Sequence, residues 1–151
     1  MNKGTILGID YGRARIGLSI SEGILASPIK YILNKGNAKN LAVFKELQQK
    51  YKYNSILLGV PLHIDGGETA MSREIRAFGE YLGNGLGVEV VYHNERYSSK
   101  EAEEHIRNNL GIKNPKKIAE LVDSMAATMV LSQYLQHCEN EKLIIKNEEL
   151  R

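Results

Sequence analysis

The stretch from Gly8 to Ser21 constrains the fold most, because an aspartate ends an otherwise apolar run there. The apolar run at residues 5–9 predicts a β-strand, and a second β-type run at 16–20 follows a glycine-containing turn, so the two form a hairpin. Asp10 ends the first strand, although aspartate is depleted in strands and a charge is costly to bury. Asp10 is therefore either a turn residue that bonds its own backbone, or part of a metal or phosphate site at the end of a central strand.

The rest of the chain predicts alternating strands and helices. Further β-type runs lie at 24–33, 55–60 and 88–92, and Pro28 in the first of them marks an edge strand or a bulge. Apolar residues at helical spacing, together with helix caps, predict helices at about 38–52, from Met71 to Leu82, between Ser98 and Gly111, and from Asn114 to about His137. An antiparallel meander followed by βα units predicts an α/β fold, a mixed sheet with helices on both faces.

Composition is that of an ordinary globular protein of one domain. The 151 residues are 42% hydrophobic and 25% charged, and no run approaches the ~20 apolar residues that cross a bilayer. We therefore expect a cytoplasmic protein without a membrane partner. The single cysteine, Cys138, excludes an internal disulfide framework. We expect one domain over 1–138 and a loosely ordered, charged tail over 139–151.

Three acidic residues lie where secondary structure does not require them. Asp10 ends the first strand, Glu95 follows the fifth, and Asp123 interrupts an apolar helical stretch. Ala126 and Ala127, one turn after Asp123, would let that helix lie close to the sheet. Because the carboxyl ends of parallel strands meet at one edge, where active sites of open α/β sheets lie, we expect these acids to gather there.

Carboxylates gathered in this way predict a site for Mg²⁺ or Mn²⁺. Two such ions can hold the attacking and leaving oxygens of a phosphodiester, whereas the acids without metal would repel one another. Each acid also has a structural alternative: a turn for Asp10, a pair with Arg96 for Glu95, and a buried donor for Asp123. The occurrence of all three at one predicted edge favours the metal site.

Five basic residues are candidates for contacts with phosphates. Arg13 and Arg15 flank the hairpin turn, and solvated turn charges are the alternative. Arg96 adjoins Glu95 and would hold a phosphate or pair with that acid. Lys116 and Lys117 lie at a helix start, where the dipole does not favour cations, which indicates a phosphate contact or else a solvated loop.

The chain resembles the YqgF family, also called RuvX, of the RNase H-like superfamily. The motifs that carry the resemblance are Gly8-Ile9-Asp10-Tyr11-Gly12, Gly59-Val60-Pro61-Leu62, Glu95-Arg96 and Asp123-Ser124-Met125-Ala126-Ala127. The resemblance implies a five-stranded sheet of order 3-2-1-4-5 with strand 2 antiparallel, and Asp10, Glu95 and Asp123 as the metal-binding acids of a nuclease. Asn94 stands where the family usually has an acid, which would weaken metal binding if that acid is a ligand.

The resemblance also implies a substrate. It points to a metal-dependent endonuclease that processes the 5′ end of pre-16S rRNA, with structured RNA or a ribosomal particle as its partner. The alternative is a Holliday junction resolvase that cuts branched DNA at the same site. Two further hypotheses involve no cleavage: the chain would be a non-catalytic RNA-binding protein or a nucleotide-binding module. The latter is suggested because residues 8–12 are similar to the phosphate loop of actin-like kinases, although those proteins need two lobes.

Overall fold

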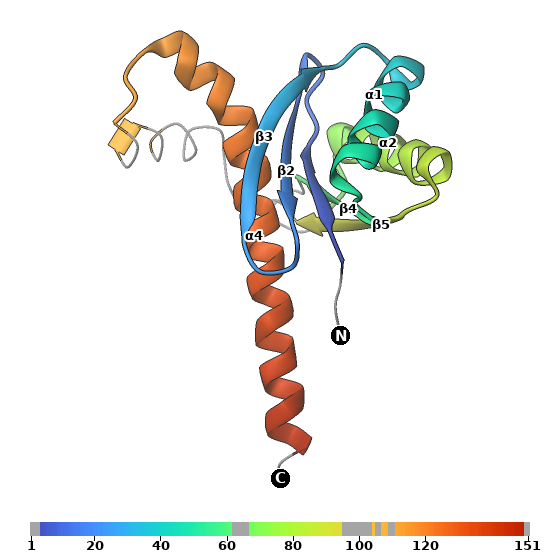
Figure 1. Cartoon of the computed structure of the whole chain (residues 1–151), viewed down its shortest axis with the longest axis vertical. Helices are drawn as coiled ribbons and strands as arrows, with labels where there is room; N and C mark the ends of the chain where they lie inside the picture. The colour runs from blue at the N-terminus through green and yellow to red at the C-terminus, as the bar shows by residue number, and fades with distance from the viewer. Residues whose placement is uncertain (1–3, 62–66, 95–103, 105–106, 109–110, 150–151) are drawn as a thin grey trace.

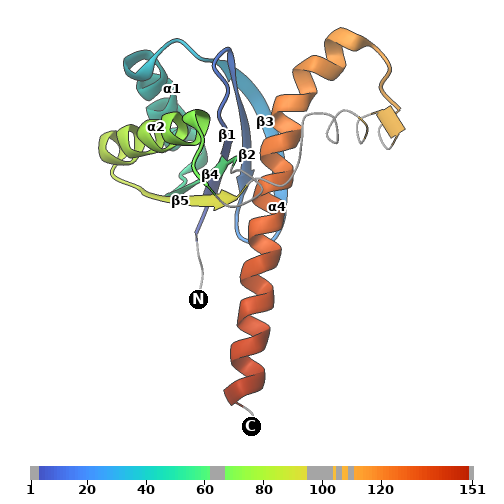
Figure 2. The same ribbon diagram turned by 180° about the vertical axis from the view of Figure 1, so that it is seen from behind.

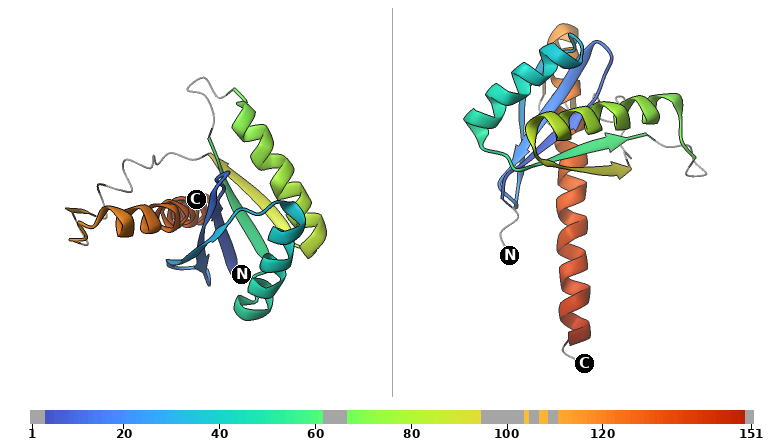
Figure 3. Two further views of the ribbon diagram at one scale, coloured as in Figure 1. Left: turned by 90° about the horizontal axis from the view of Figure 1, so that it is seen from above. Right: turned by 90° about the vertical axis from the view of Figure 1, so that its right-hand side faces the viewer.

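The structure is a computed structural model that describes residues 4–61, 67–94, 104, 107–108 and 111–149, and of residues 120, 123 and 142–149 only the backbone. A five-stranded sheet forms its centre. Two helices, α1 and α2, cover one face of the sheet, and the long helix α4 lies against the other (Figures 1 and 2). The view from above shows the same three layers (Figure 3). Helices therefore cover both faces, as the sequence predicts.

The sheet has the predicted topology. Its strands are β1 (Ile6–Asp10), β2 (Arg15–Ser21), β3 (Ala26–Leu33), β4 (Ser55–Val60) and β5 (Glu89–Asn94). Their order is β3-β2-β1-β4-β5. Strand β2 is antiparallel to both β1 and β3, whereas β1, β4 and β5 are parallel to one another. The parallel pairs require crossover connections, which α1 and α2 provide.

The main core lies between the sheet and the helices α1 (Asn37–Tyr51) and α2 (Ala70–Leu86). Phe44 of α1 and Phe78 of α2 meet edge to face there, with 6.1 Å between ring centres. Strand β4 is buried at five of its six positions, as the continuous apolar run predicts. At the start of α2, Thr69 and Ser72 form a reciprocal capping box that satisfies otherwise unpaired backbone donors.

Helix α4 (Pro115–Glu149) packs very close to the other face of the sheet. The Ser19 hydroxyl on β2 donates to the carbonyl oxygen of Ala127 at 3.0 Å. A Cβ added at Gly8 would lie 2.3 Å from the Ser19 Oγ and 3.1 Å from the Leu131 Cβ, so no larger residue fits at that position without a shift. Ala126 and Ala127 are both buried. The predicted close approach through small residues is confirmed.

The C-terminal residues differ from the expectation. Residues 139–149, expected to be a loosely ordered tail, continue α4 as one helix that extends beyond the sheet (Figure 1). Neither proline nor glycine follows Pro115 in α4, and Glu, Lys and Leu are strong helix formers. A contact between side chains one turn apart, with 3.1 Å between His137 Nε2 and Glu141 Oε1, also favours the helix.

Two further findings concern expected segments. The helix predicted between Ser98 and Gly111 lies for the most part outside the described residues. Within the described part of the chain, no helix has both the length and the apolar character needed to cross a bilayer.

Candidate functional site

The register of the sheet places Asp10 at one edge, beside the ends of two parallel strands. β1 pairs with β4 through Ile9 and Leu58, and β4 pairs with β5 through Gly59 and His93. Following each strand by one residue places Asp10, Gly59 and His93 in a single row. All three residues lie at the carboxyl ends of their strands, which is the edge that carries active sites in open α/β sheets.

Two hydrogen bonds fix how α4 crosses the sheet relative to this row. Ser124 Oγ donates to the carbonyl oxygen of Ile29 on β3 at 2.6 Å, and Ser19 of β2 donates to Ala127. In the sheet register the first bond lies nearer the Asp10 end than the second. Helix α4 therefore runs antiparallel to β1, and the turn that contains Asp123 lies toward the edge that carries Asp10.

The structure thus places Asp10 and the Asp123 turn of the α4 backbone toward the edge at which β5 also ends, and of the three predicted acids it describes only the side chain of Asp10. Asp10 is half-buried at the end of β1. Glu95 follows the last residue of β5 and lies outside the described residues, as does the side chain of Asp123. Among the described residues, no group of three or more His, Cys, Asp and Glu side chains could hold a metal ion. The three-carboxylate site stays a prediction, supported by the placement of the backbone and by the oxygen donors that a hard cation prefers.

The predicted arginines have different surroundings. Arg13 forms an ion pair with Glu74 of α2, with 3.3 Å between Arg13 Nη2 and Glu74 Oε1. The hydrogen bond from Arg13 is the main reason that the pKa of the Glu74 carboxyl is lowered. Arg15 instead places its guanidinium carbon 5.4 Å from the centre of the Tyr31 ring, a cation–π distance. Arg96 lies outside the described residues.

The predicted lysines are exposed on the first turn of α4. The Asn114 side-chain oxygen accepts hydrogen bonds from the backbone N–H groups of Lys116 at 3.0 Å and Lys117 at 3.4 Å. This cap confirms the helix start predicted from Asn114 and Pro115. Because the cap uses backbone groups, it leaves the side chains of Lys116 and Lys117 to face solvent at the N-terminal end of the helix that carries Asp123.

Sequence reasoning missed two residues near this edge, His93 and Tyr31. The His93 ring lies 6.0 Å from the Tyr134 ring in an edge-to-face arrangement, which places His93 on the α4 side of the sheet. Burial, with a smaller contribution from Cys138, raises the pKa of Tyr134 to about 12, so its hydroxyl stays protonated. The sequence could have indicated that His93 lies near this edge, because it comes two residues before Glu95. Nothing in the local sequence indicates that Tyr31 lies near it.

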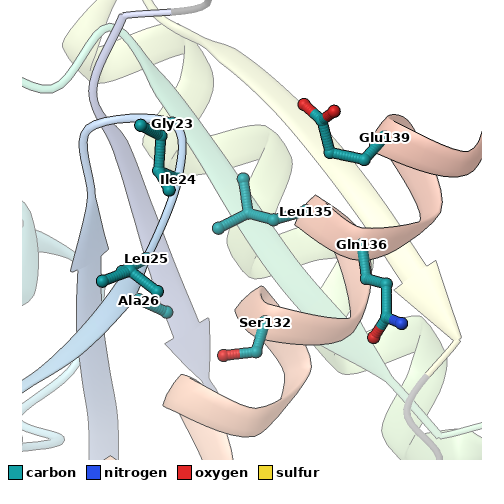
Figure 4. Close-up of a pocket in the computed structure, with 8 residues that line it drawn as sticks. All are labelled: Gly23, Ile24, Leu25, Ala26, Ser132, Leu135, Gln136 and Glu139. Carbon is teal, nitrogen blue, oxygen red and sulfur yellow. The ribbon is translucent and has the colours of Figure 1, made fainter. Parts of the chain in front are cut away.

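A surface depression lies away from this edge, between the β2–β3 turn and the C-terminal half of α4 (Figure 4). It has a volume of about 360 Å³, and its lining includes Ile24 and Leu25, whose exposed fractions are 86% and 78%. Glu139 is the one acid among its lining residues in the described part of the chain. Because the β2–β3 turn lies beside the amino end of β1, this depression is at the end of the sheet opposite Asp10.

The family of the chain follows from its sequence over nearly its whole length. The RuvX family, described as "Holliday junction resolvase", matches residues 4–137. The chain belongs to the RuvX family. A relative from Syntrophus aciditrophicus (strain SB) is 32% identical over 140 residues, which cover 91% of this chain and 92% of the relative. One from Anaeromyxobacter dehalogenans (strain 2CP-C) is 36% identical over 131 residues, covering 85% and 94%. Both relatives bear the name "Putative pre-16S rRNA nuclease".

Solved structures share the fold of this RuvX protein. The Fowlpox virus resolvase in complex with Holliday junction DNA matches with a TM-score of 0.60 and covers 89% of this chain and 98% of its own. Thermus thermophilus RuvC in complex with a Holliday junction substrate matches with a TM-score of 0.57, covering 89% and 96%. Each is 14% identical to this chain, so the likeness concerns the fold. The predicted RNase H-like fold is confirmed.

Proposed function

We propose that this RuvX protein is a metal-dependent endonuclease that processes the 5′ end of pre-16S rRNA. The observation that carries the proposal is one edge of the sheet: the register brings the ends of β1 and β5 there, and two hydrogen bonds of α4 turn the backbone around Asp123 toward it. The proposal is further supported by the names of the two relatives, whose alignments cover 91% and 85% of this chain.

In this proposal Asp10, Glu95 and Asp123 hold Mg²⁺ or Mn²⁺. The bound ions would stabilise charge on the attacking and leaving oxygens of the phosphodiester. Asp10 is fixed for this role because its backbone pairs with Gly17 at the end of a central strand. Asn94 ends β5 with a neutral amide, whereas the resemblance implies an acid at this position, so the proposed site lacks one carboxylate if that acid is a ligand. We therefore expect weaker metal affinity than in relatives that have the acid.

RNA is the substrate that the names of the relatives favour, and a four-way DNA junction is the alternative that the family description and the resolvase fold favour. The chemistry of the site does not distinguish them, because carboxylate-held metal ions can cleave either phosphodiester. Symmetric cleavage of a junction requires two active sites at a fixed separation, and hence a stable dimer. The two substrates therefore predict different products.

The test is a side-by-side assay with the purified protein and Mn²⁺. One substrate is an RNA fragment that contains the 5′ leader of pre-16S rRNA, and the other is a mobile four-way DNA junction. We expect the leader to be cut faster than the junction. Paired, symmetric nicks in the junction with an intact leader would replace the RNA assignment with the resolvase alternative.

We expect Lys116→Glu to weaken binding of the leader RNA and to reduce its salt dependence. Lys116 is exposed on the first turn of α4, so the substitution removes a cation from that end of the helix. Loss of one phosphate contact should lower the slope of log K against log salt by about 1. The matched control is Lys45→Glu on α1, which lies on the opposite face and should bind as wild type does. An equal effect of both substitutions would indicate general charge rather than a contact at Lys116.

A further inference from the structure

We propose that a pocket between the edge strand β3 and α4 binds an unpaired RNA nucleotide close to the cleaved bond. Tyr31 would stack on the base, and Lys30 would hold a phosphate. This inference rests on the proposed nuclease function, which it extends by naming the substrate feature that the site selects. Three observations support it: a β-bulge, the pocket that the bulge residues line, and the charge around that pocket.

The bulge lies in the same row of the sheet as Asp10. Ile32 pairs with Ile16 and Ile29 pairs with Leu18, so two residues of β3, Lys30 and Tyr31, face only Gly17. Gly17 in turn pairs with Asp10. Strands lie about 4.8 Å apart, so the bulge is roughly 10 Å from β1 across the sheet. Bulges redirect side chains and are frequent beside active sites.

The pocket has a wall from the bulge and a wall from α4. Its volume is about 400 Å³, and the described residues that line it are Pro28, Ile29, Lys30, Tyr31, Leu121 and Ser124. This volume is in the range of small-molecule sites, which begins at about 300 Å³. Leu121 and Ser124 flank Asp123 in the sequence, so the α4 wall belongs to the turn that carries a predicted metal-binding acid. The hydrogen bond from Ser124 to Ile29 holds the two walls together.

The chemistry of the pocket suits a nucleotide. Tyr31 is half-buried and has the Arg15 guanidinium 5.4 Å from its ring centre, while Lys30 is exposed. Bases stack on aromatic rings and on guanidinium planes, and cations bind the phosphates between them. The described lining contains a lysine and no acid. A base within a duplex is covered by its neighbours on both faces, so only an unpaired nucleotide can reach Tyr31.

Binding of a short, single-stranded leader RNA in EDTA tests the proposal, because EDTA is expected to prevent turnover. We expect Tyr31→Ala to weaken binding about tenfold, the size of one lost stacking contact. Tyr31→Phe keeps the ring and should stay within about twofold of wild type. The matched control is Tyr81→Ala, which removes a tyrosine of 38% exposure from α2 on the other face and should change nothing. Fully paired RNA should bind all four proteins alike.

A second measurement needs no altered protein. Nucleotides of the RNA are replaced one at a time by an abasic nucleotide, and we expect one position near the cleaved bond to lose about tenfold in affinity for the wild type. Tyr31→Ala should show no further loss at that position, because both changes remove the same contact.

Several results would overturn the pocket. Tyr31→Ala could bind single-stranded RNA as tightly as wild type does. It could instead lose affinity for single-stranded and paired RNA equally, or lose affinity only for single-stranded DNA. A wild-type protein that loses affinity at one abasic position as expected, but cuts no RNA in Mn²⁺, would instead overturn the nuclease proposal. The two outcomes can be told apart because the binding measurement does not depend on cleavage.

Discussion

Replacing Asp10 with asparagine is expected to abolish RNA cleavage and to leave the fold intact. The Asp10 side chain lies at the end of a central strand, in the row that β4 and β5 continue. Loss of a metal-binding carboxylate should reduce the rate by more than the 10- to 100-fold that loss of an outer-shell partner costs. Because two other acids are predicted at this edge, removing one negative charge should leave thermal stability without metal unchanged or slightly higher.

Two comparisons make this result specific. Asp123→Asn should have the same effect on cleavage, because we assign both carboxylates to the same ions. Glu22→Gln neutralises an exposed acid in the β2–β3 turn, at the opposite end of the sheet, and should leave the rate unchanged. A clear drop in the unfolding temperature of metal-free Asp10→Asn would support a purely structural role for Asp10, as a turn residue that bonds its own backbone.

The parts of the fold that the sequence could predict are those that local rules determine. Residues 55–60 are apolar without alternation and end at Pro61, which indicates a strand covered on both faces. Asp10 could be assigned to a strand end because an apolar run stops there and a glycine-containing turn follows. From these strand ends, the rule for parallel sheets predicted that β1 and β5 would end at one edge, and the register confirms it.

The bulge at Lys30 and Tyr31 could not be predicted, because register depends on the partner strand. The sequence offered Pro28 as the mark of an edge or a bulge, and β3 is indeed an edge strand. Pro28 itself pairs regularly with Ser19, and the irregularity comes after it, opposite Gly17. Only the pairing of β3 with β2 shows that Tyr31 shares a row with Asp10.

The C-terminal part of α4 was missed for a different reason. Residues 139–149 are mostly charged, and charged composition without apolar periodicity favours a disordered prediction. The helix nevertheless continues, because elongation from an existing helix avoids the cost of nucleation. The first part of α4 packs on the sheet and so supplies that existing helix.

Removal of divalent metal is the second change that is expected to abolish cleavage. Without metal, the carboxylates of Asp10, Glu95 and Asp123 would face a polyanionic substrate with like charge, and no ion would stabilise the attacking and leaving oxygens of the phosphodiester. Excess EDTA should therefore stop cleavage of the leader RNA completely, and Mg²⁺ or Mn²⁺ should restore it.

Calcium tests whether the ion does more than neutralise the carboxylates. Ca²⁺ accepts the same oxygen ligands, but at longer distances and with looser geometry than Mg²⁺. We expect Ca²⁺ to support binding of the RNA and to leave it uncut, because in-line attack needs both oxygens held at fixed positions.

The Asn94 amide adds a quantitative expectation. Asn94→Asp should lower the Mn²⁺ concentration that gives half-maximal cleavage, because a fourth carboxylate strengthens the site. Full cleavage in excess EDTA would exclude a metal-dependent mechanism, and an unchanged Mn²⁺ requirement in Asn94→Asp would place residue 94 outside the metal site.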